Sequence, residues 1–154
     1  MWLFVSVEEG GLEMQEVRAL VVDDFEQWRK VVRVALQGKL GLHIIEEAAD
    51  GLEAVQRAQS MQPDLVVLDI GLPMLNGLDV ARHIGRVSPK SKVVFLTENH
   101  SCDIREAALQ DGASGYVVKS AFASELVPAV EAVLEGRQFL SARLTASAIE
   151  SQTA

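Results

Sequence analysis

Five residues of this chain are of the types that phosphoryl and metal chemistry require, and each lies at the end of a short apolar run. Asp23 and Asp24 follow the first of these runs, Asp69 follows a later one, and Thr97 and Lys119 end two more. Three carboxylates brought together repel one another and raise one another's pKa values unless a cation compensates them. A hard divalent cation such as Mg²⁺ suits a site made of few carboxylates, waters and a phosphoryl group.

The remaining roles in phosphoryl transfer fit the same set. Lys119 offers a positive charge for a phosphoryl oxygen and Thr97 a hydroxyl donor, and this reaction depends on positioning and charge neutralisation. Asp69 is itself able to accept the group as an aspartyl phosphate. Each residue alone also has an ordinary explanation, because Asp favours turns, a lysine suits a solvated turn and a threonine hydroxyl can bond to backbone. Together, five such residues at four strand ends favour the chemical interpretation.

Apolar segments alternate with amphipathic ones along the central part of the chain. Uninterrupted apolar runs predict strands, and apolar residues at helical spacing between them predict helices. The expected strands are residues 17–22, 42–45, 65–68, 93–96 and 115–118, and the expected helices cover residues 28–36, 50–58, 76–84, 103–111 and 122–133. Short strands that alternate with helices imply a parallel sheet covered on both faces. The carboxyl ends of its strands meet at one edge, where open α/β sheets place their ligand sites.

Three helix starts can be predicted from single residues. Asp50 lies three residues before Glu53, which is typical of a capping box, and Asn76 opens the next helix. In the last helix, Pro128 falls within or just after the first turn if Ser124 is the N-terminal cap, a place where proline is tolerated.

Length and composition fit one globular domain. The chain has 154 residues, and no stretch approaches the roughly 18 uninterrupted apolar residues that cross a bilayer. Residues 1–16 show no clean period and are expected to form a leader or extension, residues 17–142 the domain, and residues 143–154 a tail or a linker cut short. A single cysteine excludes an intramolecular disulfide framework, and the formal net charge of −8 opposes direct nucleic-acid binding by this segment. We expect a cytoplasmic protein.

The motifs around the five residues resemble the receiver domain of two-component response regulators, over residues 17–142. The stretches that carry the resemblance are Val21-Val22-Asp23-Asp24, Leu68-Asp69-Ile70-Gly71-Leu72-Pro73 with Asn76-Gly77, Leu96-Thr97, and Gly112-Ala113-Ser114-Gly115-Tyr116-Val117-Val118-Lys119. The last of them and residues 136–141 look like the subgroup that usually carries a C-terminal helix-turn-helix, although no basic recognition helix follows Ser141. The resemblance implies a flavodoxin-like (βα)5 doubly wound parallel sheet with strand order 2-1-3-4-5.

The family also implies how the acidic site works. Asp69 would take a phosphoryl group from a phosphohistidine on a sensor histidine kinase or a phosphotransfer protein. Asp23, Asp24 and Asp69 would hold Mg²⁺ together with the backbone carbonyl of Gly71, and Lys119 would contact the phosphoryl group. No membrane partner is expected, and a homodimer is compatible with this family.

Thr97 and Tyr116 would connect this site to the surface formed by the fourth helix, the fifth strand and the fifth helix. Tyr116 also has an ordinary explanation as a half-buried residue that packs in its strand. Two neighbours depart from the family pattern. Glu98 stands where a small residue is usual and could narrow the phosphoryl entrance or repel the group. Ser120 stands where many members have proline, and without proline a cis bond costs about 3 kcal/mol.

Two other functions compete with a phosphoryl-accepting receiver. A haloacid-dehalogenase-type phosphatase also uses an aspartate at a strand end, but it needs a second aspartate two residues later, where this chain has Gly71. A degenerate receiver would be an interaction module independent of phosphorylation, and it ranks second because all five chemical residues are present. The preferred interpretation is a receiver that catalyses its own phosphorylation and dephosphorylation and does not turn over an external substrate.

Overall fold

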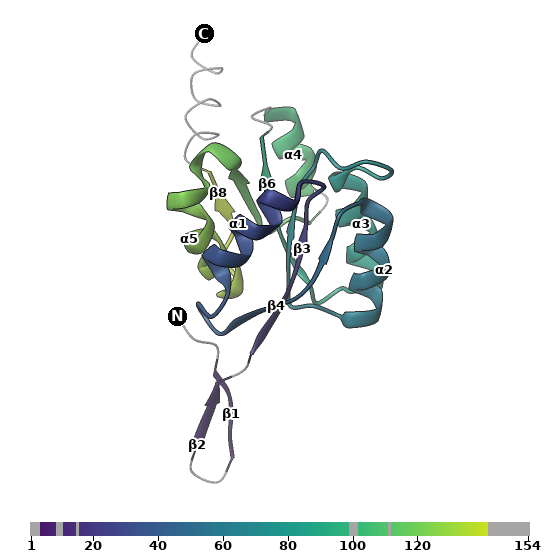
Figure 1. Ribbon diagram of the computed structural model, residues 1–154. Coiled ribbons are helices and arrows are strands. Elements are labelled where there is room, and N and C mark those ends of the chain that lie inside the picture. Colours follow the sequence, from purple (N-terminus) through teal and green to yellow (C-terminus); the bar gives the residue numbers. More distant parts are fainter. Residues whose placement is uncertain (1–3, 9–10, 15, 99–101, 111, 142–154) are drawn as a thin grey trace.

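A six-stranded parallel sheet forms the centre of the computed structural model, which describes residues 4–8, 11–14, 16–98, 102–110 and 112–141 (Figure 1). The strands are β3 (Val17–Val22), β4 (Leu42–Ala48), β5 (Leu65–Leu68), β6 (Lys92–Thr97), β7 (Gly115–Val118) and β8 (Phe139–Leu140). Their order is β4-β3-β5-β6-β7-β8, and all neighbouring pairs are parallel. The five strands predicted from the sequence therefore lie in the order 2-1-3-4-5, which confirms the flavodoxin-like fold.

Helices cover both faces of this sheet (Figure 1). On one face lie α1 (Glu26–Leu36) and α5 (Phe122–Leu134), and on the other lie α2 (Gly51–Met61), α3 (Gly77–Val87) and α4 (Cys102–Gln110). A 3-10 turn, η1 (Lys119–Ala121), joins β7 to α5. All five predicted helices are present, with ends that differ from the expected ones by a few residues.

Each central strand contributes to two separate cores. In β5, Val66 and Leu68 belong to the core that includes residues of α2, α3 and α4, whereas Leu65 and Val67 belong to the core that includes residues of α1 and α5. Successive side chains of a strand point to opposite faces, so a strand covered on both faces has to be apolar throughout. This explains the uninterrupted apolar run that precedes Asp69, in which all four side chains are buried.

The second strand is longer than predicted. β4 continues through Glu46 and Glu47 to Ala48, although two consecutive glutamates interrupt the apolar pattern. β4 is an edge strand, where charged side chains are tolerated. Glu47 pairs with Arg29 of α1 at 3.1 Å, and Glu46 pairs with Arg57 of α2. Ion pairs with helices on opposite faces thus replace apolar packing at this end of the strand.

The sequence pattern did not indicate β8. Its two residues pair with Gly115 and Tyr116 of β7, and the Ser141 N–H donates to the Tyr116 carbonyl at 2.8 Å. Two residues are too few to show a period, which is why this edge strand escapes a periodicity argument.

Two of the predicted helix starts are confirmed. Oδ1 of Asp50 accepts a hydrogen bond from the Glu53 N–H at 2.8 Å, and Oδ1 of Asn76 accepts one from the Asp79 N–H at 3.1 Å. Each cap satisfies a backbone donor that the first turn of a helix leaves without an intrahelical acceptor.

The last helix begins at the expected residue, but Ser124 is not its N-terminal cap. α5 begins at Phe122, immediately after η1, so Ser124 lies within its first turn and its hydroxyl donates to the Ala121 carbonyl at 3.3 Å. Pro128 consequently lies inside the helix, where it removes one backbone N–H donor. The strand passes into the helix through a 3-10 turn, a geometry that capping signals do not reveal.

Residues 1–16, predicted as a leader or extension, contain the antiparallel strands β1 (Phe4–Glu8) and β2 (Gly11–Met14), which the sequence did not indicate. In Figure 1 this pair extends away from the six-stranded sheet. The predicted tail, residues 143–154, falls outside the described residues. Among the described helices, none is long and apolar enough to cross a membrane.

Candidate functional site

The ends of four parallel strands bring the predicted site residues to one edge of the sheet. Asp23 and Asp24 follow β3, Asp69 follows β5, Thr97 is the last residue of β6, and Lys119 follows β7. These strands neighbour one another in register, so their carboxyl ends lie together.

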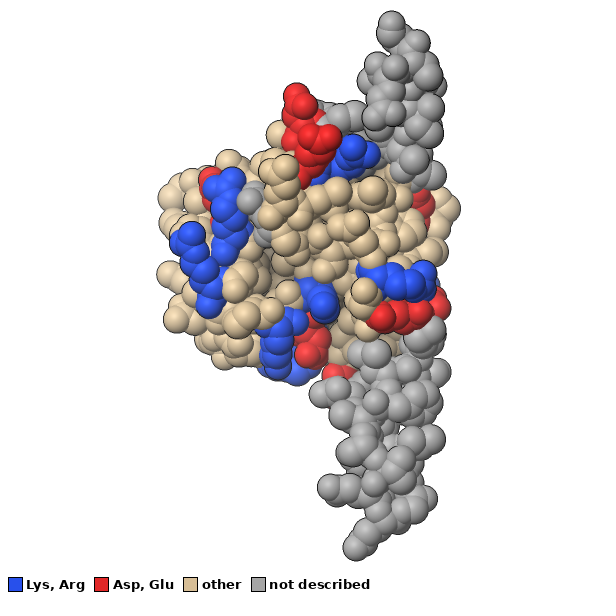
Figure 2. All heavy atoms as spheres, turned by 180° about the vertical axis from the view of Figure 1, so that it is seen from behind, with Lys and Arg blue, Asp and Glu red and all other residues tan. Residues whose placement is uncertain are grey.

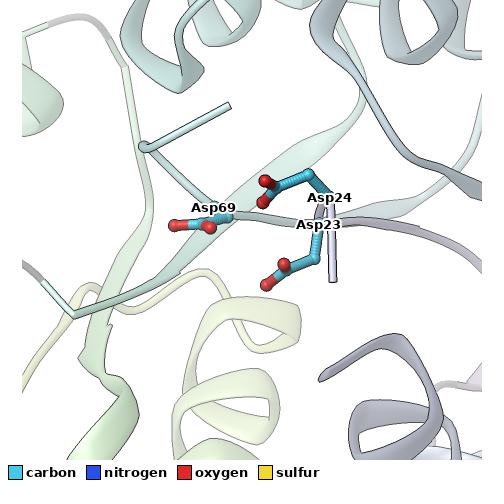
Figure 3. Close-up of side chains that lie close together, drawn as sticks. All are labelled: Asp23, Asp24 and Asp69. Carbon is cyan, nitrogen blue, oxygen red and sulfur yellow. The ribbon is translucent and has the colours of Figure 1, made fainter. Parts of the chain in front are cut away.

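The three aspartates form a compact cluster in which their carboxylates approach one another (Figure 3). One oxygen of each lies within 4.8 Å of the other two. A hydrogen bond of 3.0 Å from the Asp69 N–H to the Val22 carbonyl fixes the end of β5 against the end of β3. Asp23 and Asp69 are buried, whereas Asp24 is exposed. The cluster therefore has one side that faces solvent.

Lys119 places its ammonium between two of these carboxylates. Nζ lies 2.8 Å from Oδ2 of Asp23 and 3.3 Å from Oδ2 of Asp69, and the side chain is only 4% exposed. A buried lysine needs such partners, because an unpaired ammonium in the interior is very costly. The residue predicted as a phosphoryl contact is thus already beside Asp69, which lies 50 residues earlier in the chain.

Burial is the largest influence on Asp23 and raises the pKa of its carboxyl above the ordinary value. The charge of Asp69 adds to the increase, while hydrogen bonds from Lys119 and from the Phe25 N–H, at 2.9 Å, reduce it. The repulsion between carboxylates that the sequence predicts is therefore present, but it is smaller than the effect of desolvation.

This donor set fits Mg²⁺. Three carboxylates and one ammonium leave an excess of two negative charges when all are ionised, which a divalent cation would offset. Hard oxygen ligands and an exposed carboxylate that leaves room for water are what Mg²⁺ prefers. Gly71, whose carbonyl is the fourth expected ligand, lies on the wall of the same cavity, and its N–H donates to Oδ1 of Asp69 at 3.3 Å.

A cavity of about 370 Å³ opens beside Asp69. Thr97 and Lys119 line it from the neighbouring strands, and Glu98 lines it as well. Its other lining residues are Phe25, Ile70 and Gly71. The Glu98 carboxylate, which departs from the family pattern, thus lines the cavity that an anionic group would enter.

Tyr116 lies elsewhere, behind the site in the core. Its side chain is fully buried, and its ring centroid is 6.1 Å from that of Phe95. Burial raises the pKa of its phenol to about 12, an increase that the charge of Arg105 reduces and the charge of Asp69 reinforces. The ring of Tyr116 therefore points into the core and not to the surface. The peptide bond between Lys119 and Ser120 is trans.

Trp28 is a site neighbour that the sequence did not indicate. It lies on α1, where its helical spacing predicted an ordinary core residue, and its ring lies under the Lys119 ammonium with 4.8 Å between Nζ and the ring centroid. No motif contains it, because the contact depends on how α1 packs beside η1.

Comparisons with known proteins agree with this geometry. The family described as the response regulator receiver domain matches residues 19–131. Response regulator GacA of Pseudomonas viridiflava is 33% identical over 83% of this chain and 60% of its own length. The transcriptional regulatory protein LnrK of Bacillus subtilis is 34% identical over 84% of this chain and 59% of its own length. The chain thus spans about 60% of the length of these curated relatives.

Solved structures give the same result. A two-component response regulator of the LuxR family from Aurantimonas sp. SI85-9A1 matches with a TM-score of 0.84 and 32% identity, over 91% of this chain and all of that one. The signal receiver domain of NarL from Mycobacterium tuberculosis matches with a TM-score of 0.75 and 30% identity, over 80% of this chain and 99% of that one.

Proposed function

The chain belongs to the response regulator receiver domain family, and on that premise we propose that it accepts a phosphoryl group on Asp69 as part of a two-component phosphorelay. The observation that carries this assignment is the buried ammonium of Lys119, 3.3 Å from Asp69 at the wall of an open cavity. The Asp69 carboxylate, as nucleophile, and the fixed positive charge of Lys119 therefore lie side by side at a cavity that an anionic donor can enter.

In the proposed reaction, an oxygen of Asp69 attacks the phosphorus of a phosphohistidine on a sensor kinase or phosphotransfer protein. The new O–P bond forms as the P–N bond breaks, and the electron pair leaves with the imidazole nitrogen. Lys119 and the Thr97 hydroxyl receive the equatorial phosphoryl oxygens, so that developing charge meets donors already in place. Mg²⁺ would supply the remaining positive charge, held by Asp23, Asp24, Asp69 and the Gly71 carbonyl.

We further propose that this segment acts in the cytoplasm through protein partners and does not contact nucleic acid itself. The net charge is −8, which repels a phosphate backbone. On the described part of the face in Figure 2, Lys and Arg side chains are dispersed, and several lie beside Asp or Glu. The described part of this face therefore shows no continuous basic patch of the kind that nucleic-acid binding uses. A second copy of the chain is a further candidate partner.

The proposed output is a shift between two packings of the core. Phosphorylation would draw the Thr97 hydroxyl toward the new phosphoryl oxygens and fix the Tyr116 ring inward, which would alter the surface of α4, β7 and α5. NMR shifts of residues 97–119, with and without Mg²⁺ and a phosphoryl mimic, test this coupling. If only the shifts of Asp23, Asp24 and Asp69 change, and those of α4 and Tyr116 do not, the coupling is contradicted and Tyr116 serves only as a packing residue.

Incubation with phosphoramidate and Mg²⁺, followed by intact-mass analysis, tests the acceptor. The wild-type chain should gain one phosphoryl group, and Asp69→Asn should gain none. Asp103→Asn is a matched control, because Asp103 is an exposed carboxylate on α4. Labelling that persists in Asp69→Asn would contradict the acceptor assignment, and a wild-type chain that is never labelled would favour an interaction module.

A further inference from the structure

Lys119 is held by a third group besides its two carboxylates, and that group is the aromatic ring of Trp28. The ammonium lies over the ring face, 4.8 Å from the centroid. A cation at this distance is attracted by the ring quadrupole, and tryptophan gives the strongest such attraction among the aromatic side chains. Since Lys119 is almost fully buried, this attraction is little screened by water.

The ring is itself held in place by the turn that carries the lysine. Phe122 meets it edge to face, with 5.5 Å between centroids and 86° between planes. Phe122 is the first residue of α5, and its N–H donates to the carbonyl of Lys119, the first residue of η1. The same short turn therefore supplies two contacts to the Trp28 ring. The Lys119 ammonium lies over its face, and the Phe122 ring meets it edge to face. α1 and the start of α5 are joined through this contact.

From this geometry we propose that Trp28 is a positioning residue, whose ring keeps the Lys119 ammonium beside Asp69 for the incoming phosphoryl group. The proposal rests on the assignment of Asp69 as acceptor. A lysine side chain has a flexible four-carbon stem, and ordering it costs conformational entropy. A ring that fixes its end in advance removes that cost from the transfer step.

An aromatic ring is suited to this task for an electrostatic reason. Three carboxylates already gather here, and a further acidic group placed to hold Lys119 would repel an anionic donor. The Trp28 ring attracts the ammonium without adding net negative charge. Trp28 thus adds attraction for the cation while leaving the charge of the cavity unchanged.

The first test compares initial rates of Asp69 labelling by phosphoramidate at saturating Mg²⁺. Trp28→Leu keeps apolar bulk but removes the ring, and should slow labelling about tenfold, whereas Trp28→Phe keeps a weaker ring and should recover part of the rate. Val32→Ala is the packing control, because Val32 is buried on the same helix within the same core. It should lower stability without slowing labelling.

A spectroscopic test reports the contact in the otherwise intact chain. The sequence has two tryptophans, so Trp2→Phe leaves Trp28 as the only indole. Its emission should change when Lys119→Met removes the cation, and again when Mg²⁺ and phosphoramidate label Asp69 and the ammonium turns toward the phosphoryl oxygens. This readout also decides the matter if Trp28→Leu does not fold.

The outcomes separate the two proposals. If the wild-type chain is not labelled on Asp69, the phosphoryl-acceptor function is contradicted, and so is the role of Trp28, which depends on it. If the wild-type chain is labelled but Trp28→Leu reacts at the wild-type rate, or is slowed no more than Val32→Ala, only the role of Trp28 is overturned. Emission that is unchanged both by Lys119→Met and by labelling would overturn it as well.

Discussion

The ammonium of Lys119 lies 2.8 Å from Oδ2 of Asp23, and both side chains are buried. The pair joins the end of β7 to the end of β3 across the two strands between them. Breaking a buried pair by removing one partner leaves the other charge without compensation, which typically costs about 3 to 5 kcal/mol. Lys119 is therefore expected to support both the fold and the chemistry of this edge.

Lys119→Met should lower the free energy of unfolding by about 3 kcal/mol in the absence of metal, because Asp23 and Asp69 remain buried without their cation. Mg²⁺ should restore more stability to this variant than to the wild-type chain, since the ion would supply the missing positive charge. Urea unfolding with and without Mg²⁺ measures both effects. Lys92→Met, at an exposed position on β6, is the control. Equal stability of the two variants would contradict a structural role for the pair.

Mg²⁺ and a phosphoryl mimic such as beryllofluoride should bind cooperatively, because the cation offsets the carboxylates that repel the anion. Asp24→Asn should weaken Mg²⁺ binding by about tenfold or more, the range that loss of metal-site groups produces, while Asp69 stays available as acceptor. Titration calorimetry of each ligand alone and in the presence of the other measures the coupling. Affinities that do not depend on the second ligand would rule out a shared site.

Glu98→Gln should speed labelling by small anionic donors about threefold to fivefold at low salt. The carboxylate lies on the wall of the cavity beside Thr97 and Lys119, and one charge near a solvated entrance contributes about 1 kcal/mol. Added salt should reduce the difference, because exposed charges are screened. Glu106→Gln removes an exposed carboxylate from α4 and is the control. Rates that are identical in Glu98→Gln and wild type would show that Glu98 does not oppose entry.

The strand ends that carry the site residues, and the helix caps at Asp50 and Asn76, were predictable because each depends on a few adjacent residues. The apolar run before Asp69 had to be buried on both faces, and the caps at Asp50 and Asn76 form within their own first turns. The convergence of Asp23, Asp69 and Lys119 followed from the parallel sheet alone, since that topology brings the carboxyl ends together.

Features that depend on contacts between distant elements were not predictable in this way. Glu46 and Glu47 remain in β4 because arginines of α1 and α2 reach them from opposite faces. The contact of Trp28 with Lys119 requires the packing of α1 beside η1. The chain enters α5 through the 3-10 turn η1 and not through a cap at Ser124. None of these contacts leaves a periodic signal in the sequence.

The phenol of Tyr116 can be titrated directly by absorbance, because Tyr116 is the only tyrosine in the chain. Burial is the main cause that raises the pKa of this phenol to about 12, whereas the unfolded chain has a value near 10. The folded chain therefore keeps a proton that the unfolded chain loses. The stability linked to this proton is complete below pH 10 and is lost as the pH rises toward 12, by about 2 to 3 kcal/mol in total.

The ultraviolet absorbance of the phenolate should accordingly appear with a midpoint near pH 12 while circular dichroism still shows a folded chain. Tyr116→Phe should remove the part of the pH-dependent loss of stability that begins near pH 10, because phenylalanine has no proton to lose. A phenolate midpoint near 10 in a folded chain would show that the ring lies at the surface in solution. That result would favour an outward resting position, from which phosphorylation of Asp69 would have to draw the ring inward. A high midpoint without a phosphoryl mimic would instead show that the inward position of Tyr116 does not require phosphorylation.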